Sequence, residues 1–284
     1  MLCLCFGVDM KSFNNKTVLL TGASTGIGYA MAHMLSDKGA NLIITARGRD
    51  KLEDLAKELH AKNTQTHIFP LDISQPNSAQ DLFKQIDEAN LKVDLLINNA
   101  GYGRWGEFTE IQMQDYENMI QLNITSLTEL SYLFANKMVE RGSGGIINIA
   151  STAALYPIPY SAVYAATKSY VLSLSEALNF EYSSKGIRVM AVCPGATESK
   201  FVERATENSK RLQQRMSKFK DVENSTMRIQ SAEDCAKEAL DAFLKGKIYV
   251  ITGRSNRTLY TLSRFFTRKG MLSLAGRAFK KIAG

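Results

Sequence analysis

The stretch that decides the fold is KTVLLTGASTGIGYAMAHML, residues 16–35. Its first five residues form a short apolar run that stops at Thr21 and Gly22, which predicts a buried strand. The apolar residues after the glycines recur at helical spacing, which predicts a helix that opens directly after the turn. Such a turn lets backbone N–H groups approach a pyrophosphate, whose charge is favoured by the helix N-terminus. The stretch therefore predicts the first unit of a dinucleotide-binding sheet.

The same alternation of strand and helix continues along the chain. Amphipathic helical segments separate six further apolar runs of strand length, namely NLIITA (41–46), THIFPLD (66–72), VDLLINNA (93–100), GIINIAS (145–151), IRVMAVCP (187–194) and KIYVITG (247–253). Strands joined by helices form βαβ units with right-handed crossovers. The sequence thus predicts an α/β fold, a Rossmann-like, doubly wound, mostly parallel seven-stranded sheet with helices on both faces.

The overall composition is that of a chain with a sizeable core. The 284 residues are 45% hydrophobic and 22% charged. The four cysteines and the histidines at 33, 60 and 67 lack disulfide or metal-ligand spacing, which predicts a cytoplasmic-type compartment and no metal site. No apolar run reaches the roughly 18 residues of a spanning helix. We expect one domain over 16–253, an N-terminal extension over 1–15 and a tail over 254–284.

The positive charge is concentrated at the C-terminal end. The net charge is +7, and from Ala242 onward there are ten Lys or Arg and no Asp or Glu, so the preceding residues carry 7 − 10 = −3. This distribution argues against a nucleic-acid-binding core. In the tail, Leu and Phe alternate with basic residues, which predicts an amphipathic hairpin or helix pair. Three roles are open for this tail: it could lie on an anionic membrane surface, dock an acidic carrier protein or acyl-CoA, or pack on the domain or a second subunit.

The glycine spacing in the opening stretch is Gly-x-x-x-Gly-x-Gly, at Gly22, Gly26 and Gly28. It differs from the common G-x-G-x-x-G fingerprint and resembles the short-chain dehydrogenase/reductase family, whose cofactor turn reads TGxxxGxG. The resemblance covers most of the chain and weakens beyond residue 200. It implies a nicotinamide dinucleotide held by Gly22, Ser24, Thr25, Gly26, Ile27, Gly28, Arg47, Asp72, Ile73, Asn99, Ala100, Gly101, Tyr164, Lys168, Pro194, Gly195 and Thr197.

The end of the second predicted strand bears on the choice of cofactor. A ribose 2′-hydroxyl is usually met there by an acidic residue, and a 2′-phosphate by Arg. The chain reads TARGRD (45–50), with Ala46 where the acid stands in the family's NAD users, followed by Arg47. Guanidinium binds phosphate bidentately, which favours NADP(H) over NAD(H), with Ser24 or Arg49 as further contacts. The alternative is that Arg47 is a solvated loop residue.

Four polar residues match the family's catalytic set by position. Tyr164 and Lys168 lie four apart in VYAATKSY (163–170), on one face of a predicted helix. Ser151 ends the fifth predicted strand, and Asn123 lies on the preceding helix. The resemblance implies that Asn123 carries protons from Lys168 to solvent, through a water held at a helix distortion. It also implies that Asp72 faces the adenine and that Thr197 contacts the carboxamide.

The chemistry of carbonyl reduction explains these residue types. The cofactor supplies a hydride and the protein supplies a proton. Lys168 near the phenolate would favour its ionisation by about 4 kcal/mol at ~4 Å and an effective dielectric of ~20. We therefore expect the pKa of Tyr164 to fall well below its ordinary value, less what burial takes back. Tyr164 then acts as general acid or base, while Ser151 binds the carbonyl oxygen.

Substrate recognition is expected from segments beside this site. The candidates are GYGRWGEF (101–108), ALYPIPY (154–160) and the charged stretch 198–230, which form either a greasy pocket or part of the core. The tail resembles that of DltE-type oxidoreductases and of hydroxysteroid and 3-oxoacyl-CoA reductases, which implies a lipophilic carbonyl or alcohol and a homo-oligomer. A catalytically silent NADP(H)-binding sensor or membrane-surface scaffold is the alternative. An epimerase or dehydratase is a third interpretation, although these usually have a longer substrate domain.

Overall fold

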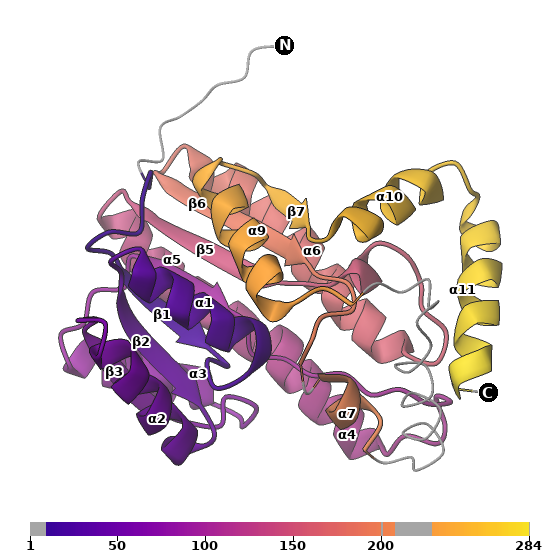
Figure 1. Ribbon diagram of the computed structural model, residues 1–284, viewed down its shortest axis with the longest axis horizontal. Helices are drawn as coiled ribbons and strands as arrows, with labels where there is room; N and C mark the ends of the chain where they lie inside the picture. The colour runs from indigo at the N-terminus through magenta and orange to yellow at the C-terminus, as the bar shows by residue number, and fades with distance from the viewer. Residues whose placement is uncertain (1–9, 200, 208–228, 284) are drawn as a thin grey trace.

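Seven strands form one sheet at the centre of the protein (Figure 1). The computed structural model describes residues 10–199, 201–207 and 229–283. The strands are β1 (Thr17–Thr21), β2 (Asn41–Ala46), β3 (Thr66–Pro70), β4 (Leu95–Asn98), β5 (Gly144–Ile149), β6 (Ile187–Cys193) and β7 (Tyr249–Ile251). Their order is β3-β2-β1-β4-β5-β6-β7, and every pairing is parallel. The predicted fold class is confirmed, with a sheet that is parallel throughout.

Helices connect the strands and follow the last one. Before β6 they are α1 (Gly26–Asp37), α2 (Arg49–His60), α3 (Ser78–Glu88), α4 (Met113–Ile120), the π-helix η1 (Gln121–Ser126), α5 (Leu127–Glu140), the 3-10 turn η2 (Thr152–Ala154) and α6 (Ala162–Ser183). After β6 come α7 (Phe201–Ala205), α9 (Ala232–Leu244), α10 (Arg254–Ser263) and α11 (Arg268–Ala283). None of the helices in the described ranges is long and apolar enough to cross a membrane.

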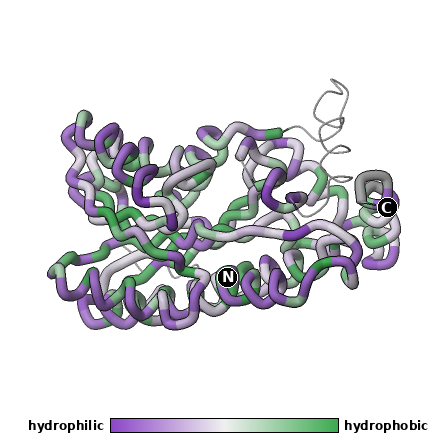
Figure 2. The backbone as a smooth tube through the Cα atoms, turned by 90° about the horizontal axis from the view of Figure 1, so that it is seen from below, coloured by the Kyte–Doolittle hydropathy of each residue, from purple (hydrophilic) through white to green (hydrophobic). Residues whose placement is uncertain are grey.

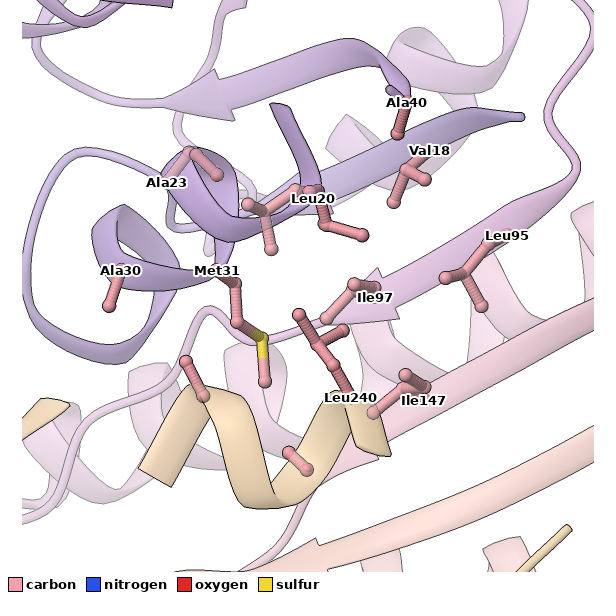
Figure 3. Packing of buried hydrophobic residues seen from close by; sticks show 14 of the residues in the cluster. Val18, Leu20, Ala23, Ala30, Met31, Ala40, Leu95, Ile97, Ile147 and Leu240 are labelled. Carbon is pink, nitrogen blue, oxygen red and sulfur yellow. The ribbon is translucent and has the colours of Figure 1, made fainter. Parts of the chain in front are cut away.

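The two faces of the sheet have separate cores. Val18 and Leu20 point into a cluster covered by α1, α2 and α9, where Met31 meets Leu240 (Figure 3). Leu19, between them in sequence, points into the opposite cluster, which α3 and α5 cover. Successive residues of a strand face opposite sides, so strands buried on both sides are apolar throughout. Figure 2 shows this arrangement, with hydrophobic strands between helices that are largely hydrophilic outside.

The core begins earlier than the predicted boundary at residue 16. Met10 and Phe13 are buried, and the ring of Phe13 stacks on Phe243 of α9 at 6.4 Å. Residues 10–15 therefore pack with the domain, while 1–9 lie outside the described residues. The rest of the predicted extension has no structural description.

The strand order reverses between β1 and β4. The chain leaves β1 toward β2 and β3 on one side, then returns to β4 on the other. The connections at the carboxyl ends of β1 and β4 therefore separate, and they leave a crevice in which doubly wound sheets bind ligands. This topology makes the carboxyl edge the place to look for the site.

Candidate active site

The structure brings the residues singled out in the sequence to that carboxyl edge. The β1–α1 turn and the start of α1 contain Gly22, Ser24, Thr25, Gly26, Ile27 and Gly28. The segments that directly follow the other strands contain Arg47 (after β2), Asp72 and Ile73 (after β3), Asn99, Ala100 and Gly101 (after β4), Ser151 (after β5), and Pro194, Gly195 and Thr197 (after β6). The remaining residues lie on helices, with Asn123 on η1 and Tyr164 and Lys168 on α6. Six strands thus contribute to one region.

The glycine turn is tied to the end of β4 by Asn99. Its amide donates to the backbone oxygens of Thr21 at 3.0 Å and Gly22 at 3.1 Å. Gly22 has a φ of +66°, which favours glycine. A Cβ at Gly28 would lie 2.4 Å from the Gly22 oxygen and 2.5 Å from Asn99 Nδ2. The absence of both side chains is what allows this close packing.

The N-terminus of α1 is open to an anion. Thr25, the residue before the helix, makes no side-chain capping bond, and the first turn has no acidic residue. The first N–H groups of a helix lack intrahelical partners and carry partial positive charge. Across the turn, a Cβ at Gly26 would come within 3.0 Å of Ser199 Cβ, so the segment after β6 folds over the glycines. These features fit the pyrophosphate of a dinucleotide.

Arg47 extends from the end of β2 into solvent. Among the described residues its guanidinium has no ion pair, whereas Arg49 pairs with Glu53 within α2 at 3.7 Å. Asp72 accepts hydrogen bonds at Oδ1 from the backbone N–H and the hydroxyl of Ser74. Arg47 therefore remains able to bind a ligand phosphate, while Arg49 is already engaged.

Ser151, Tyr164 and Lys168 converge although they come from a strand end and a helix. The Ser151 side chain lies close enough to the Tyr164 phenol to lower its pKa, while the Ser151 hydroxyl donates to the backbone oxygen of Pro194 at 3.4 Å. Lys168, only 4% exposed, donates from Nζ to the backbone oxygen of Ile149 at 2.8 Å, and Nζ lies 5.8 Å from the Tyr164 ring centroid. The three side chains thus lie together at the carboxyl end of β5.

Burial has the largest effect on the pKa values of Tyr164 and Lys168. Burial raises the pKa of Tyr164 to about 12, although the nearby Ser151 side chain lowers it in part. Burial also lowers the pKa of Lys168 to about 8. The expected fall of the Tyr164 pKa does not appear in this structure, because desolvation disfavours the phenolate and Lys168 Nζ is bonded to Ile149. Tyr164 is held as a neutral phenol, the form that can donate a proton.

Asn123 lies on a distorted stretch of helix, as the resemblance implied. The residues Gln121–Ser126 form a π-helix between α4 and α5. The buried Asn123 amide donates to Tyr102 O at 2.9 Å and Thr167 Oγ1 at 3.1 Å, and its oxygen accepts from Tyr102 N at 3.2 Å. A Cβ at Gly101 would lie 3.0 Å from Asn123 Oδ1 and 3.2 Å from Lys168 Nζ, so both side chains approach the same backbone position.

The chain matches a known protein family over most of its length. The short chain dehydrogenase family profile matches residues 16–210. The chain belongs to the short-chain dehydrogenase/reductase family. An uncharacterized oxidoreductase of Staphylococcus haemolyticus is 32% identical over 196 residues, which are 69% of this chain and 84% of the relative. Sulfoacetaldehyde reductase 2 of Chromohalobacter salexigens is 33% identical over 65% of this chain and 73% of the relative.

Solved structures of the family agree with this assignment. A short-chain dehydrogenase from Sphingobium yanoikuyae, in complex with NADPH, has a TM-score of 0.75 at 30% identity, covering 88% of this chain and 91% of that one. The protein is therefore an oxidoreductase of the short-chain dehydrogenase/reductase family.

The sequence patterns did not single out the side chain that lies against Tyr164 in this short-chain dehydrogenase. Phe201, at the start of α7, lies with its ring centroid 5.3 Å from that of Tyr164. A Cβ at Gly103 would come within 2.9 Å of Phe201 Cζ and 3.0 Å of Tyr164 Cδ2, so this glycine makes room for both rings. Phe201 lies in the charged stretch 198–230, and its apolar side chain among charged residues is the only feature of the sequence that could have indicated a place beside Tyr164.

Arg104 joins the candidate substrate segments of this family member. Its Nη2 lies 3.0 Å from Asp115 Oδ1 on α4 and 2.7 Å from Glu207 Oε1 beyond α7. Gly106 N donates to Tyr160 O at 2.9 Å, which connects the segments 101–108 and 154–160. The two segments and α7 thus form one wall beside Tyr164, while 208–228 of the charged stretch lie outside the described residues.

Proposed function

We propose that the protein is an NADP(H)-dependent oxidoreductase that interconverts a carbonyl and an alcohol by hydride transfer. The observation that carries this proposal is the meeting of Ser151, Tyr164 and Lys168 beside an uncapped, glycine-lined helix N-terminus. One centre thus combines proton-donating groups with a place for a dinucleotide. We also propose that this unit is a single domain over 16–253, with residues 10–15 packed against it, followed by the tail over 254–284.

The acid and base chemistry is assigned to this chain's own side chains. NADPH, when bound, supplies the hydride. The Ser151 hydroxyl donates to the substrate carbonyl oxygen, where negative charge grows, and Tyr164 donates the proton that completes the alcohol. Behind Tyr164, Lys168 carries the positive charge, and Asn123 belongs to the polar path along which protons pass. In the reverse direction the Tyr164 phenolate removes the proton.

We further propose that Arg47 gives the protein a preference for NADP(H) over NAD(H). We expect Arg47→Asp to raise the KM for NADPH about 100-fold, because a charge-assisted contact to the 2′-phosphate is replaced by repulsion. Steady-state kinetics with NADPH and NADH measures the change. Arg49→Asp measures the part of the other candidate contact, and it should have the smaller effect because Arg49 pairs with Glu53. Equal cofactor ratios in wild type and Arg47→Asp would remove Arg47 from the site.

The pH dependence of reduction should follow Lys168. Its pKa of about 8 means that the ammonium is lost as the pH rises through that value. If the charge on Lys168 supports proton transfer, kcat/KM is level at lower pH and declines about tenfold per pH unit above it. Lys168→Arg keeps the charge over this range and should remove the decline. A profile that is unchanged in Lys168→Arg would assign the decline to another group.

The substrate proposed for this site is a lipophilic carbonyl or alcohol. Phe201 and Trp105 belong to the wall beside the proton donor, and an aromatic wall suits an apolar substrate. The relatives include a sulfoacetaldehyde reductase, so a small polar aldehyde is the competing class. NADPH oxidation across aldehydes, ketosteroids, 3-oxoacyl thioesters and sugars tests the assignment, and turnover confined to polar substrates would overturn it.

The silent sensor or scaffold remains the second candidate, and turnover in that screen decides between the two. The proposed homo-oligomer is tested by light scattering after size-exclusion chromatography. A cytoplasmic location, peripheral to a membrane, is likewise proposed, and fractionation of cells tests it.

A further inference from the structure

Helices α10 and α11 present large apolar side chains to solvent. Leu259, Leu262, Phe265 and Phe266, called the tail face below, are 50%, 54%, 84% and 52% exposed, and none of the residues of α10 is buried. Leu272 and Leu274 of α11 are also exposed, at 44% and 48%, but they lie two residues apart and so on opposite sides of that helix. Figure 1 shows the two helices as an arm along the outer side of the domain. Clustered exposed apolar residues of this kind mark an interaction surface.

The orientation of α10 is the reverse of that in an ordinary surface helix. Arg257 forms an ion pair with Glu238 of α9, and Asn256 donates to Thr252 O at 2.7 Å, so the polar side of α10 is fastened to the domain. Leu259 is two residues from Arg257, about 200° around the helix. Surface helices normally turn their apolar stripe toward the core. Here Leu259 and Leu262 point away from it, although Tyr260 adds a core contact.

The charge around the tail face has one sign. From residue 254 to 284 the chain has eight Lys or Arg and no Asp or Glu. Apart from Arg257, which pairs with Glu238, the basic residues that the structure describes as exposed there are Arg254, Arg264, Arg268, Lys269, Arg277 and Lys280. Apolar side chains flanked by cations complement a bilayer with anionic headgroups, where both kinds of group find partners at once. A binding groove in a protein would instead receive a single helical stripe, whereas the tail face continues across the turn at Phe265 and Phe266.

We propose that the tail face docks the protein on an anionic lipid bilayer, with Phe265 and Phe266 inserted below the headgroups. The basic residues around them contact the lipid phosphates. The protein lies on the membrane surface and does not cross it.

Helix α11 connects the tail to the segments near Tyr164 that are expected to bind the substrate. The ring of Phe279 meets Trp105 at 6.1 Å, edge to face, and Gly276 lies beside Pro159. Both contacts are to the segments that build the wall near Tyr164. This part rests on the proposed function: a lipophilic substrate dissolved in the bilayer would reach the site beside α11 without crossing water.

Co-sedimentation with vesicles tests the docking surface without relying on catalysis. We compare vesicles of phosphatidylcholine and phosphatidylglycerol with vesicles of phosphatidylcholine alone, at low and high salt. Wild type should bind the anionic vesicles and release at high salt. Phe265→Ser/Phe266→Ser should lower the partition coefficient about 100-fold, roughly tenfold for each buried ring. Phe265→Leu/Phe266→Leu should retain most of the binding.

Phe180→Ser is the matched control, because Phe180 of α6 is 86% exposed and lies outside the tail. It should bind vesicles as wild type does, and thermal unfolding checks that each variant is folded. The proposal is overturned if wild type stays in the supernatant with anionic vesicles, or if Phe265→Ser/Phe266→Ser binds these vesicles as tightly as Phe180→Ser does. It is also overturned if the tail substitutions leave lipid binding intact but dissociate a dimer or weaken binding to a purified acidic acyl carrier protein.

Trp105 reports on the substrate side independently of turnover, since it is the sole tryptophan of the chain. Brominated phosphatidylcholine in anionic vesicles should quench its fluorescence, because α11 holds it near the bilayer. Binding without quenching would separate the substrate entrance from the membrane and overturn that part. Loss of activity in Tyr164→Phe leaves both lipid measurements unchanged, so failure of the proposed function is distinguishable from failure of the docking surface.

Discussion

Tyr164→Phe should lower kcat for carbonyl reduction by about 100- to 10,000-fold while NADPH binds as in wild type, because only the proton donor is removed. The ring itself is retained, so its contact with Phe201 and the fit beside Gly103 are preserved. Burial raises the pKa of Tyr164 to about 12, so the wild-type group carries its proton throughout the ordinary assay range. Stopped-flow measurement of hydride transfer, with fluorescence titration of NADPH, separates the two effects.

Tyr170→Phe is the control for this experiment. Tyr170 lies on the same helix, is 37% exposed, and its hydroxyl pairs with Thr128 Oγ1 at 2.9 Å, away from Ser151. It should keep near-normal turnover. If Tyr164→Phe also kept a near-normal rate on a working substrate, Tyr164 would not be the proton donor. A large loss of NADPH affinity would instead indicate that the phenol acts mainly in cofactor binding.

Gly28→Ala is expected to abolish tight NADPH binding and to destabilise the domain. The added Cβ would stand 2.4 Å from the Gly22 carbonyl oxygen, which is backbone and cannot rotate away, and 2.5 Å from Asn99 Nδ2. Relief requires the turn to open, which breaks the bonds from Asn99 that hold it. Such overpacking costs about 1–3 kcal/mol of unfolding free energy. We expect at least about a 100-fold loss of NADPH affinity, since a similar distortion falls on the phosphate-binding N–H groups.

Calorimetric titration of NADPH and thermal unfolding measure the two consequences of this substitution. Gly270→Ala is the control, because a Cβ there meets its nearest neighbour, Thr267 Oγ1, at an ordinary 3.4 Å. It should leave both quantities near wild type. Wild-type affinity in Gly28→Ala would show that the turn does not bind the cofactor through the geometry described.

Local patterns explain why so much of the fold could be predicted. Each strand and helix has its own periodicity of apolar residues, and the turn after β1 carries its glycines within eight residues. The spacing of Tyr164 and Lys168 is likewise local. The distortion at Asn123 was implied by the family, and its π-helical form came only from the structure.

Groups that meet only through the fold could not be predicted. Phe201 reaches Tyr164 from 37 positions further along the chain (201 − 164), and Arg104 reaches Glu207 across 103 positions (207 − 104). No periodicity links such residues. From the sequence, the charge of Lys168 is expected to lower the pKa of Tyr164, whereas burial, which raises it, is the larger effect in the folded protein. Burial is a property of the whole packing and not of a motif.

The sequence by itself determined the succession of strands and helices along the chain, the glycine turn after β1 and the four-residue spacing of Tyr164 and Lys168, because neighbouring residues encode each of these features. Only the tertiary structure decided which face of α10 meets the domain, since the Arg257–Glu238 pair fixes that choice. The tail's amphipathic pattern fitted packing and docking equally well. The polar side is fastened inward, and that contact leaves Leu259 and Leu262 facing solvent.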